Sequence, residues 1–145
     1  NELIRPALSQ GEVVITDRYV DSTYAYQGGG LQLPFDDLRS IQQFATGGLQ
    51  PDVRLLLDLP VEVGLARRHG DADQVNRIDR APLEFHQRVR EAFLTLAAND
   101  SENWDIIDAS VAIEDVAAAI QTAIARRLAD WPTTAGSDRE GANAS

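Results

Sequence analysis

Residues 13–30 read VVITDRYVDSTYAYQGGG, and this stretch decides how the rest of the chain is interpreted. Its first part, residues 13–17, is a short run rich in β-branched residues that ends in an acid, which predicts a buried strand. A polar segment with three tyrosines follows and closes in three glycines. Because ligands bind at the carboxyl ends of strands in open α/β sheets, we expect the residues from Asp17 onward to face a ligand.

Two further apolar runs, residues 53–58 and 104–108, also read as strands that end in an aspartate. Helical patterns alternate with these runs. The expected helices cover residues 1–10, 36–46, 61–68, 82–96 and 113–128, with a loop-to-helix segment at 19–27 and chain breaks at the glycines of 28–30, at Pro34 and at the glycines of 47–48. The alternation predicts an α/β fold whose parallel sheet has right-handed crossovers and helices on its faces.

Composition limits the classes of function. The 145-residue chain is long enough for one domain, expected at residues 1–130, and the small polar residues of 131–145 predict a disordered tail. A net charge of −10 argues against a nucleic-acid partner, because duplex binding depends on cations that neutralise phosphates. No apolar run approaches the roughly 20 residues that span a bilayer, so we expect no membrane partner.

Cysteine and lysine are both absent from the chain. The lack of cysteine excludes thiolate metal sites and fits a cytoplasmic protein. His69 and His86 lack the spacing and partners of metal ligands, so the chain itself is expected to hold no metal. All 13 basic residues are arginines, whose planar guanidinium suits phosphate and carboxylate groups.

The segment after the first expected strand carries a candidate nucleotide pocket. Arg18 offers a fork of donors for a phosphate, Tyr26 a stacking face, and Gln27 an amide for a base, while Ser22 and Thr23 add hydroxyl groups. Together these groups resemble a nucleoside monophosphate pocket. A helix-start acid followed by a surface base is the alternative interpretation of the Asp-Arg pair alone.

The sequence closely resembles the bacterial thymidylate kinases at this point. The resemblance begins in the residues around Arg18 and extends in order from residue 1 to about residue 128. The matching motifs are IRPAL at 4–8, DRY at 17–19, STYAYQGGG at 22–30, PD at 51–52, LLDLP at 56–60, VGLAR at 63–67, RID at 77–79, Phe85, and IDA at 107–109. A series of motifs in register is far more specific than any one of them.

The resemblance implies an ATP-dependent transfer of a phosphoryl group to dTMP, which gives dTDP, with Mg²⁺ as cofactor. It implies that Arg18 contacts the substrate, that Thr23 faces the thymine, and that Tyr26 packs near the deoxyribose. Ser22 and Gln27 are expected to be neighbours of the substrate. The implied fold is the three-layer P-loop NTPase fold of nucleoside monophosphate kinases, a parallel sheet with flanking helices.

The resemblance also implies a lid at residues 67–80 that closes over the phosphates. Arg77 and Arg67 match family positions and are candidate catalytic cations, because phosphoryl transfer needs positive charge on the transferred group and exclusion of water. Asp17 is a candidate for orienting Arg18 or the water shell of the metal. Two features depart from the family: acids occupy the middle of the lid, and Leu31 stands where the family usually has an arginine.

The largest departure is the lack of a phosphate loop of the form G-x-x-x-x-G-K-[ST]. The family places this loop near the N-terminus, and the chain lacks methionine and starts in a helical pattern, so we expect a preceding N-terminal portion that carries it. In the family's sheet the strand of that loop lies between those expected at 13–17 and 53–58. This chain alone is therefore expected to have a gap in its sheet, to be unstable or to close up in a non-native way, and to be inactive as a kinase.

The expected ligands are dTMP and ATP, and a homodimer is expected because family members pair through helices. Residues 1–10 and the apolar face at 38–45 are candidates for that contact. Two alternatives remain. One is a related kinase that acts on another nucleotide or deoxynucleoside, and the other is a degenerate, non-catalytic domain that binds nucleotides or dimerises.

Overall fold

The structure is a computed structural model that describes residues 3–69 and 78–129. Along the chain the elements are α1 (Ile4–Ser9), α2 (Val20–Thr23), the π-helix η1 (Tyr24–Gly30), α3 (Phe35–Thr46), β1 (Arg54–Asp58), α4 (Val61–His69), α5 (Leu83–Asn99), β2 (Trp104–Asp108) and α6 (Ile113–Ala129). The expected tail at 131–145 lies outside the described residues. None of the described helices is long and apolar enough to cross a membrane.

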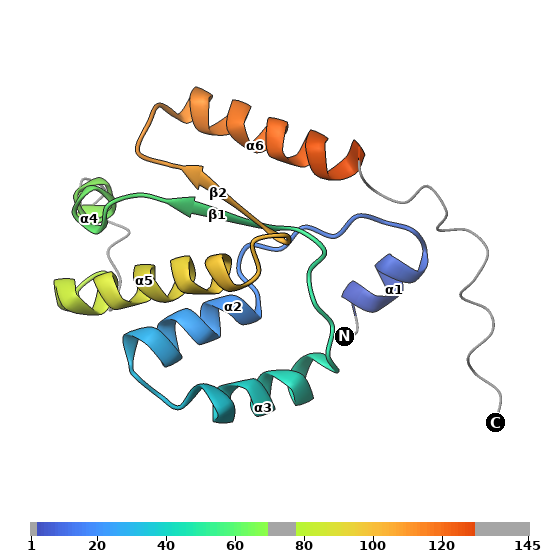
Figure 1. The fold of residues 1–145 in the computed structure, drawn as a ribbon, viewed down its shortest axis with the longest axis horizontal. Helices are drawn as coiled ribbons and strands as arrows, with labels where there is room; N and C mark the ends of the chain where they lie inside the picture. The colour runs from blue at the N-terminus through green and yellow to red at the C-terminus, as the bar shows by residue number, and fades with distance from the viewer. Residues whose placement is uncertain (1–2, 70–77, 130–145) are drawn as a thin grey trace.

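The sheet of the described chain consists of β1 and β2, which run parallel in a register that pairs Arg54 with Trp104 and Asp58 with Asp108. Helix α6 covers one face of this pair, while α5 and α2 lie on the other side (Figure 1). The arrangement is a small α/β unit with helices on both faces of a parallel pair. The predicted layering and the strands at 53–58 and 104–108 are therefore confirmed.

The strand predicted at residues 13–17 is wrong for the described structure. This segment runs without pairing to either strand, and Val13 and Ile15 are 84% and 92% exposed. A strand forms only where a neighbouring strand accepts and donates its backbone hydrogen bonds, and no described strand lies beside this segment. The apolar pattern is present, but the partner that would bury it is not among the described residues.

The chain break predicted at the glycines of 28–30 is also wrong. These residues form the last part of η1, which packs against α5 (Figure 1). A Cβ on Gly29 would lie 2.5 Å from the Cβ of Ala92, and one on Gly30 would lie 2.5 Å from the ring of Phe85. The glycines therefore continue a helix because their lack of side chains permits close contact between two helices.

The remaining helices follow their local signals. Helix α3 begins directly after Pro34 and ends at Thr46, and Gly47, the next residue, adopts a left-handed conformation with φ of 59°. Helix α5 begins directly after Pro82. The buried apolar residues are few and lie mostly between the helices and the strand pair: Val20, Ala25, Leu38, Val89, Ala97, Trp104, Ile107 and Ala123.

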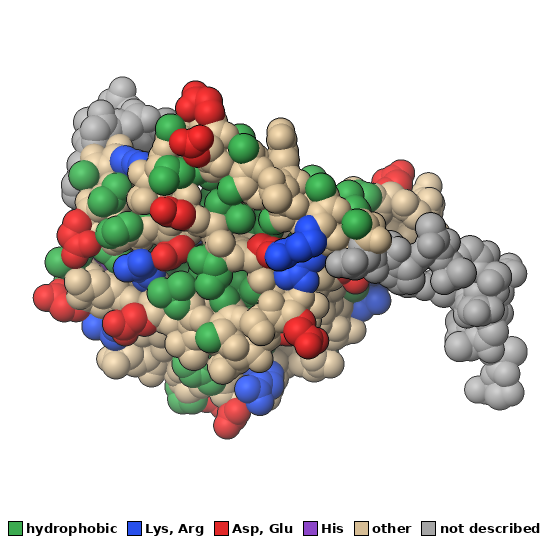
Figure 2. Space-filling model, turned by 45° about the horizontal axis from the view of Figure 1, so that its top comes forward, with side chains coloured by type: hydrophobic (Ala, Val, Ile, Leu, Met, Phe, Trp, Pro, Cys, Tyr) green, Lys and Arg blue, Asp and Glu red, His purple; other side chains and the backbone are tan. Residues whose placement is uncertain are grey.

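Several helical faces that the sequence predicts as apolar are not covered. In α3 only Leu38 is buried, whereas Ile41 is 60% exposed and Phe44 is 91% exposed. In α6 both Ile113 and Leu128 are exposed. Figure 2 shows hydrophobic side chains exposed in patches among acidic and basic ones on one face of the molecule. Within the described chain the apolar sides of α3 and α6 are therefore only partly covered.

Candidate functional site

Arg18 lies at the entrance to α2, directly after the unpaired segment 13–17, and its backbone is unusual. Its φ is 71°, in the left-handed region that non-glycine residues seldom adopt. The hydroxyl of Thr16 donates a hydrogen bond of 3.0 Å to the carbonyl oxygen of Arg18. The guanidinium Cζ lies 5.0 Å from the ring centroid of Tyr26, a cation–π contact. Two candidate site residues, Arg18 and Tyr26, are thus brought together.

Tyr26 also contacts α5. Its ring centroid lies 6.3 Å from the centroids of both Phe85 and Phe93, with interplanar angles of 56° and 82°. Such tilted and edge-to-face contacts are favourable arrangements of aromatic rings. The position of Tyr26 is therefore set by α5, while its ring supports the guanidinium of Arg18.

The other acceptor-side candidates lie on the same short helical segment. Ser22 and Thr23 belong to α2, Gln27 belongs to η1, and all three are half-buried. Within the described chain, none of these three side chains makes a hydrogen bond. Their hydroxyl and amide groups are therefore available to a ligand beside Tyr26. Asp17 is exposed, and no described contact joins its carboxylate to Arg18.

The carboxyl end of β1 is joined to α5 by a two-pronged ion pair that the sequence reading missed. Arg90 Nε lies 2.7 Å from Asp58 Oδ1, and Arg90 Nη2 lies 2.9 Å from Asp58 Oδ2. These hydrogen bonds, together with the charges of Asp58 and Glu62, raise the pKa of Arg90 above its ordinary value. The pair fixes the end of the strand on the helix that also carries Phe85 and Phe93.

The carboxyl end of β2 is organised around Asp108. Its Oδ1 accepts hydrogen bonds from the hydroxyl of Ser110 at 2.6 Å and from the Ser110 backbone N–H at 2.8 Å. These two bonds hold the pKa of Asp108 below its ordinary value, the hydroxyl contributing most. They shape the short loop that leads from β2 into α6.

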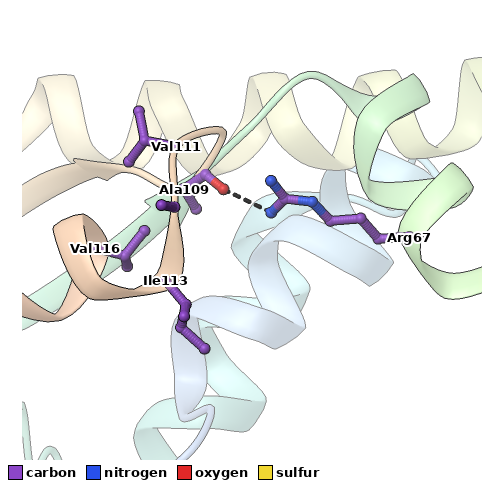
Figure 3. Close-up of a pocket in the computed structure, with 6 residues that line it drawn as sticks. Arg67, Ala109, Val111, Ile113 and Val116 are labelled. Carbon is purple, nitrogen blue, oxygen red and sulfur yellow. Dashed lines mark hydrogen bonds between the residues drawn. The ribbon is translucent and has the colours of Figure 1, made fainter.

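Arg67 lies at this same loop. Its Nη1 donates to the carbonyl oxygen of Ala109 at 2.7 Å (Figure 3). Its Nη2 donates to the carbonyl oxygen of Ser110 at 3.0 Å. The guanidinium from α4 thus reaches across to the end of β2. It borders an open pocket of about 390 Å³ whose remaining lining is mostly apolar: Ala109, Val111, Ala112, Ile113 and Val116.

The structure describes only the ends of the predicted lid at residues 67–80. Arg77, the other predicted lid cation, lies outside the described residues, as does the middle of the lid at 70–77. At the edges of this gap Arg68 Nε lies 3.1 Å from Asp79 Oδ2. Leu31 is 61% exposed directly after the glycines. Among the residues that the structure describes, no group of three or more acids or histidines is placed to hold a metal ion.

Sequence comparisons place the chain among known proteins. The family model described as thymidylate kinase matches residues 1–120. The thymidylate kinase of Thermomicrobium roseum is 50% identical over 117 residues, which cover 81% of this chain and 56% of that protein. The thymidylate kinase of Oenococcus oeni is 45% identical over 132 residues, which cover 90% of this chain and 62% of that protein.

A third relative, the thymidylate kinase of Desulfovibrio desulfuricans, is 50% identical over 129 residues, which cover 85% of this chain and 59% of that protein. The chain therefore spans about three fifths of the length of the curated relatives it matches. The match of the family model extends over Arg18, Tyr26 and the carboxyl ends of both strands. On these grounds the chain belongs to the thymidylate kinase family.

Proposed function

We propose that the protein containing this chain phosphorylates dTMP with ATP, and that this chain supplies the side of the site that holds dTMP. The observation that carries the proposal is the guanidinium of Arg18 stacked on Tyr26 beside the free polar groups of α2 and η1. A phosphate needs a charged fork of donors, and a sugar and base need an aromatic face with a few polar groups. Membership of the thymidylate kinase family supports the choice of substrate.

Within this site each side chain has a proposed role. Arg18 binds the 5′-phosphate of dTMP, Thr23 faces the thymine, and Tyr26 packs near the deoxyribose. Ser22 and Gln27 complete the hydrogen bonds around the nucleotide. An oxygen of the dTMP phosphate forms the new bond to the γ-phosphorus of ATP as the bond to the β-phosphate bridging oxygen breaks, which leaves ADP.

The donor side involves fewer residues of this chain. We propose that the pocket beside the β2–α6 loop receives the base of ATP, because a guanidinium plane and apolar walls suit a planar ring. Arg67 borders this pocket and is fixed on two carbonyl oxygens. Arg77 remains the proposed cation for the transferred phosphoryl group. Asp17 is proposed to act on Arg18 through water, since no direct contact joins the two.

We propose Mg²⁺ as the cofactor, and when bound it neutralises charge on the phosphates of ATP. The described residues do not offer a set of oxygen ligands for it. The phosphate loop and the metal ligands are proposed to belong to another part of the protein. The isolated chain is accordingly expected to have no kinase activity.

The unpaired segment at 13–17 supports this division of the site. In the proposed P-loop architecture, one further strand lies between residues 13–17 and β1, where it pairs with both. Such an arrangement would leave Val13 and Ile15 exposed and β1 with one partner in the described chain. Both features are observed there. Pairing on both sides would bury the two side chains and complete the parallel sheet.

A coupled assay of ADP formation on the complete protein tests the proposal. With ATP and Mg²⁺ we expect turnover with dTMP and much slower turnover with dUMP, dCMP, dAMP or dGMP at equal concentration. Preference for another nucleotide or for a deoxynucleoside would replace dTMP as the substrate while keeping the reaction class. Absence of turnover with every acceptor, together with retained nucleotide binding, would instead identify a non-catalytic binding domain.

A further inference from the structure

Arg88 of α5 binds the last carbonyl group of η1. Its Nη2 donates to the oxygen of Gly30 at 2.9 Å and its Nε donates to the same oxygen at 3.3 Å. Arg88 is half-buried, and no acid forms an ion pair with it in the described parts of the chain. Its charge is therefore directed at a backbone carbonyl 58 residues away in sequence.

The position of that carbonyl explains why a cation is favourable there. The final carbonyl groups of a helix lack partners within the helix and form the negative end of its dipole. An arginine with two donors satisfies such a group and complements its charge. Arg88 is thus a cap for the C-terminal end of η1, supplied by another helix instead of by residues that follow η1.

The turn that Arg88 caps contains Tyr26. The N–H of Leu31 donates to the carbonyl oxygen of Tyr26 at 3.0 Å, which is the i to i+5 hydrogen bond of a π-helix. A π-turn is rare and persists where surrounding contacts favour it over an α-helical turn. The closing hydrogen bond of this turn starts at the residue whose ring supports Arg18, so the geometry of the turn and the position of the ring are linked.

One face of α5 supplies three contacts to η1. Phe85, Arg88 and Ala92 are spaced three and four residues apart and therefore lie on the same side of the helix. Phe85 contacts the ring of Tyr26, Arg88 binds the carbonyl of Gly30, and Ala92 lies where a Cβ on Gly29 would clash. Arg90, two residues beyond Arg88, points away from this face and binds Asp58.

We propose that Arg88 is a positioning residue for the acceptor nucleotide. By capping η1 it holds the π-turn that places the ring of Tyr26, and with it the guanidinium of Arg18, against the nucleotide. This inference rests on the proposed function. Arg88 itself does not touch dTMP, so its loss weakens acceptor binding without removing a group that takes part in phosphoryl transfer.

The test compares Arg88→Gln and Arg88→Lys in the complete protein, with Arg39→Gln as the matched control. Arg39 is an exposed arginine on α3 whose nearest acid, Asp36, lies 3.8 Å away. For Arg88→Gln we expect the KM for dTMP to rise about tenfold, since a charge-assisted hydrogen bond is lost, while kcat and the KM for ATP stay within about twofold. Arg88→Lys keeps a cation near the carbonyl and is expected to restore most of the dTMP affinity. Arg39→Gln is expected to change none of these values.

A second measurement does not depend on turnover. Hydrogen exchange of the Leu31 amide in the free protein is expected to be about tenfold faster in Arg88→Gln than in the wild type. Amides in α6 should exchange as before, which separates a local effect from a loss of global stability.

The outcomes distinguish this inference from the proposed function. If the wild-type protein does not phosphorylate dTMP, both the proposed function and the positioning role are wrong. If the wild type phosphorylates dTMP and Arg88→Gln leaves the KM for dTMP unchanged, only the positioning role is wrong. An equal loss for ATP and dTMP, accompanied by faster exchange throughout the protein, would make Arg88 a purely structural residue and would also overturn the inference.

Discussion

The left-handed backbone at Arg18 carries a cost that its surroundings must offset. A non-glycine residue in this region loses on the order of 1–3 kcal/mol, and such residues cluster at binding and catalytic sites. The described contacts that hold it are the Thr16 hydroxyl on its carbonyl oxygen and the Tyr26 ring beneath its guanidinium. The strained backbone places the guanidinium of Arg18 over the ring of Tyr26, an arrangement that suits the acceptor binding we propose.

Replacing Arg18 by alanine in the complete protein removes the guanidinium that we propose binds the acceptor phosphate. We expect kcat/KM for dTMP to fall by roughly 10- to 100-fold, the equivalent of one or two strong charge-assisted hydrogen bonds. The KM for ATP should change little. Arg39→Ala serves as the control, and unchanged kinetics with dTMP in Arg18→Ala would remove the core of the proposed site.

Asp108 gives a prediction about pH. Because the hydroxyl and N–H of Ser110 favour its charged form, the pKa of Asp108 is lower in the folded protein than in the unfolded chain. Its contribution to stability is therefore present above the ordinary aspartate range and is lost as the pH falls through the lowered value. Ser110→Ala removes the larger of the two causes and should raise the pKa of Asp108, as measured by NMR titration of the carboxyl carbon.

The control for this titration is Thr122→Ala. This change removes a hydroxyl that lies within α6 and donates to the carbonyl oxygen of Ala118. That change should leave the Asp108 titration in place. Equal titration curves for Ser110→Ala and the wild type would show that the Ser110 hydroxyl does not shape the loop after β2.

At the scale of elements, the contact between η1 and α5 depends on glycine. A Cβ on Gly30 would lie 2.5 Å from the ring of Phe85 and 2.8 Å from Val89, so Gly30→Ala must separate the two helices. We expect a loss of about 1–3 kcal/mol in the free energy of unfolding, as for other overpacked cores. Urea unfolding of the complete protein measures the loss, and the KM for dTMP should rise because Tyr26 moves with η1.

Gly64→Ala is the matched control for this element. Gly64 lies within α4, and a Cβ there would meet only Leu59, at 3.8 Å. Alanine is the better helix former by up to about 1 kcal/mol, so this change should be neutral or stabilising. Equal losses for the two alanine variants would show that the close approach of η1 and α5 is not what Gly30 is needed for.

The helices also show which features of the fold local sequence signals can predict. Helix α3 and helix α5 were predicted closely because Pro34, Gly47 and Pro82 mark their ends locally. The glycines of η1 were misread because the same residue type marks a break in an isolated chain and a close contact in a packed one. No local signal distinguishes the two cases, since the contact involves a helix more than 50 residues further along the chain.

The candidate site was predictable to a similar extent. Arg18 and Tyr26 were identified from their place after an apolar run and from the family motifs, and the structure brings them together. Arg88 and Arg90 were missed because their partners, Gly30 and Asp58, are 58 and 32 residues away. Their spacing on opposite sides of one helix was a signal that two different neighbours exist, but it did not identify them.

At the scale of the whole molecule, the strand predicted at 13–17 shows the limit of reading a pattern without its partners. The apolar, β-branched residues were recognised correctly, yet pairing is a property of two strands and not of one. In the described chain this segment is exposed and β1 pairs only with β2. The same reasoning applies to helical faces, where an apolar stripe predicts burial but does not say against what.

For α1 and α3 the partner of the exposed apolar face can be tested. We expect the complete protein to form a homodimer through these two helices. Arg5 of α1 donates to the carbonyl oxygens of Thr46 and Gly47 at 3.1 and 2.9 Å, which fixes α1 at the end of α3. Leu3, directly before α1, and Ile41 and Phe44 of α3 remain exposed, and water contact with such large apolar groups is unfavourable.

Phe44→Asp would place a charge on this surface and should convert the dimer to a monomer in light scattering. Leu128→Asp, an equally drastic change on the exposed side of α6, should leave the dimer intact. A monomeric wild type would contradict the proposed dimer, and a dimer lost only in the Leu128 variant would place the contact elsewhere. Burial of the exposed Phe44 ring between two copies is the stabilising effect that the proposal requires of α3.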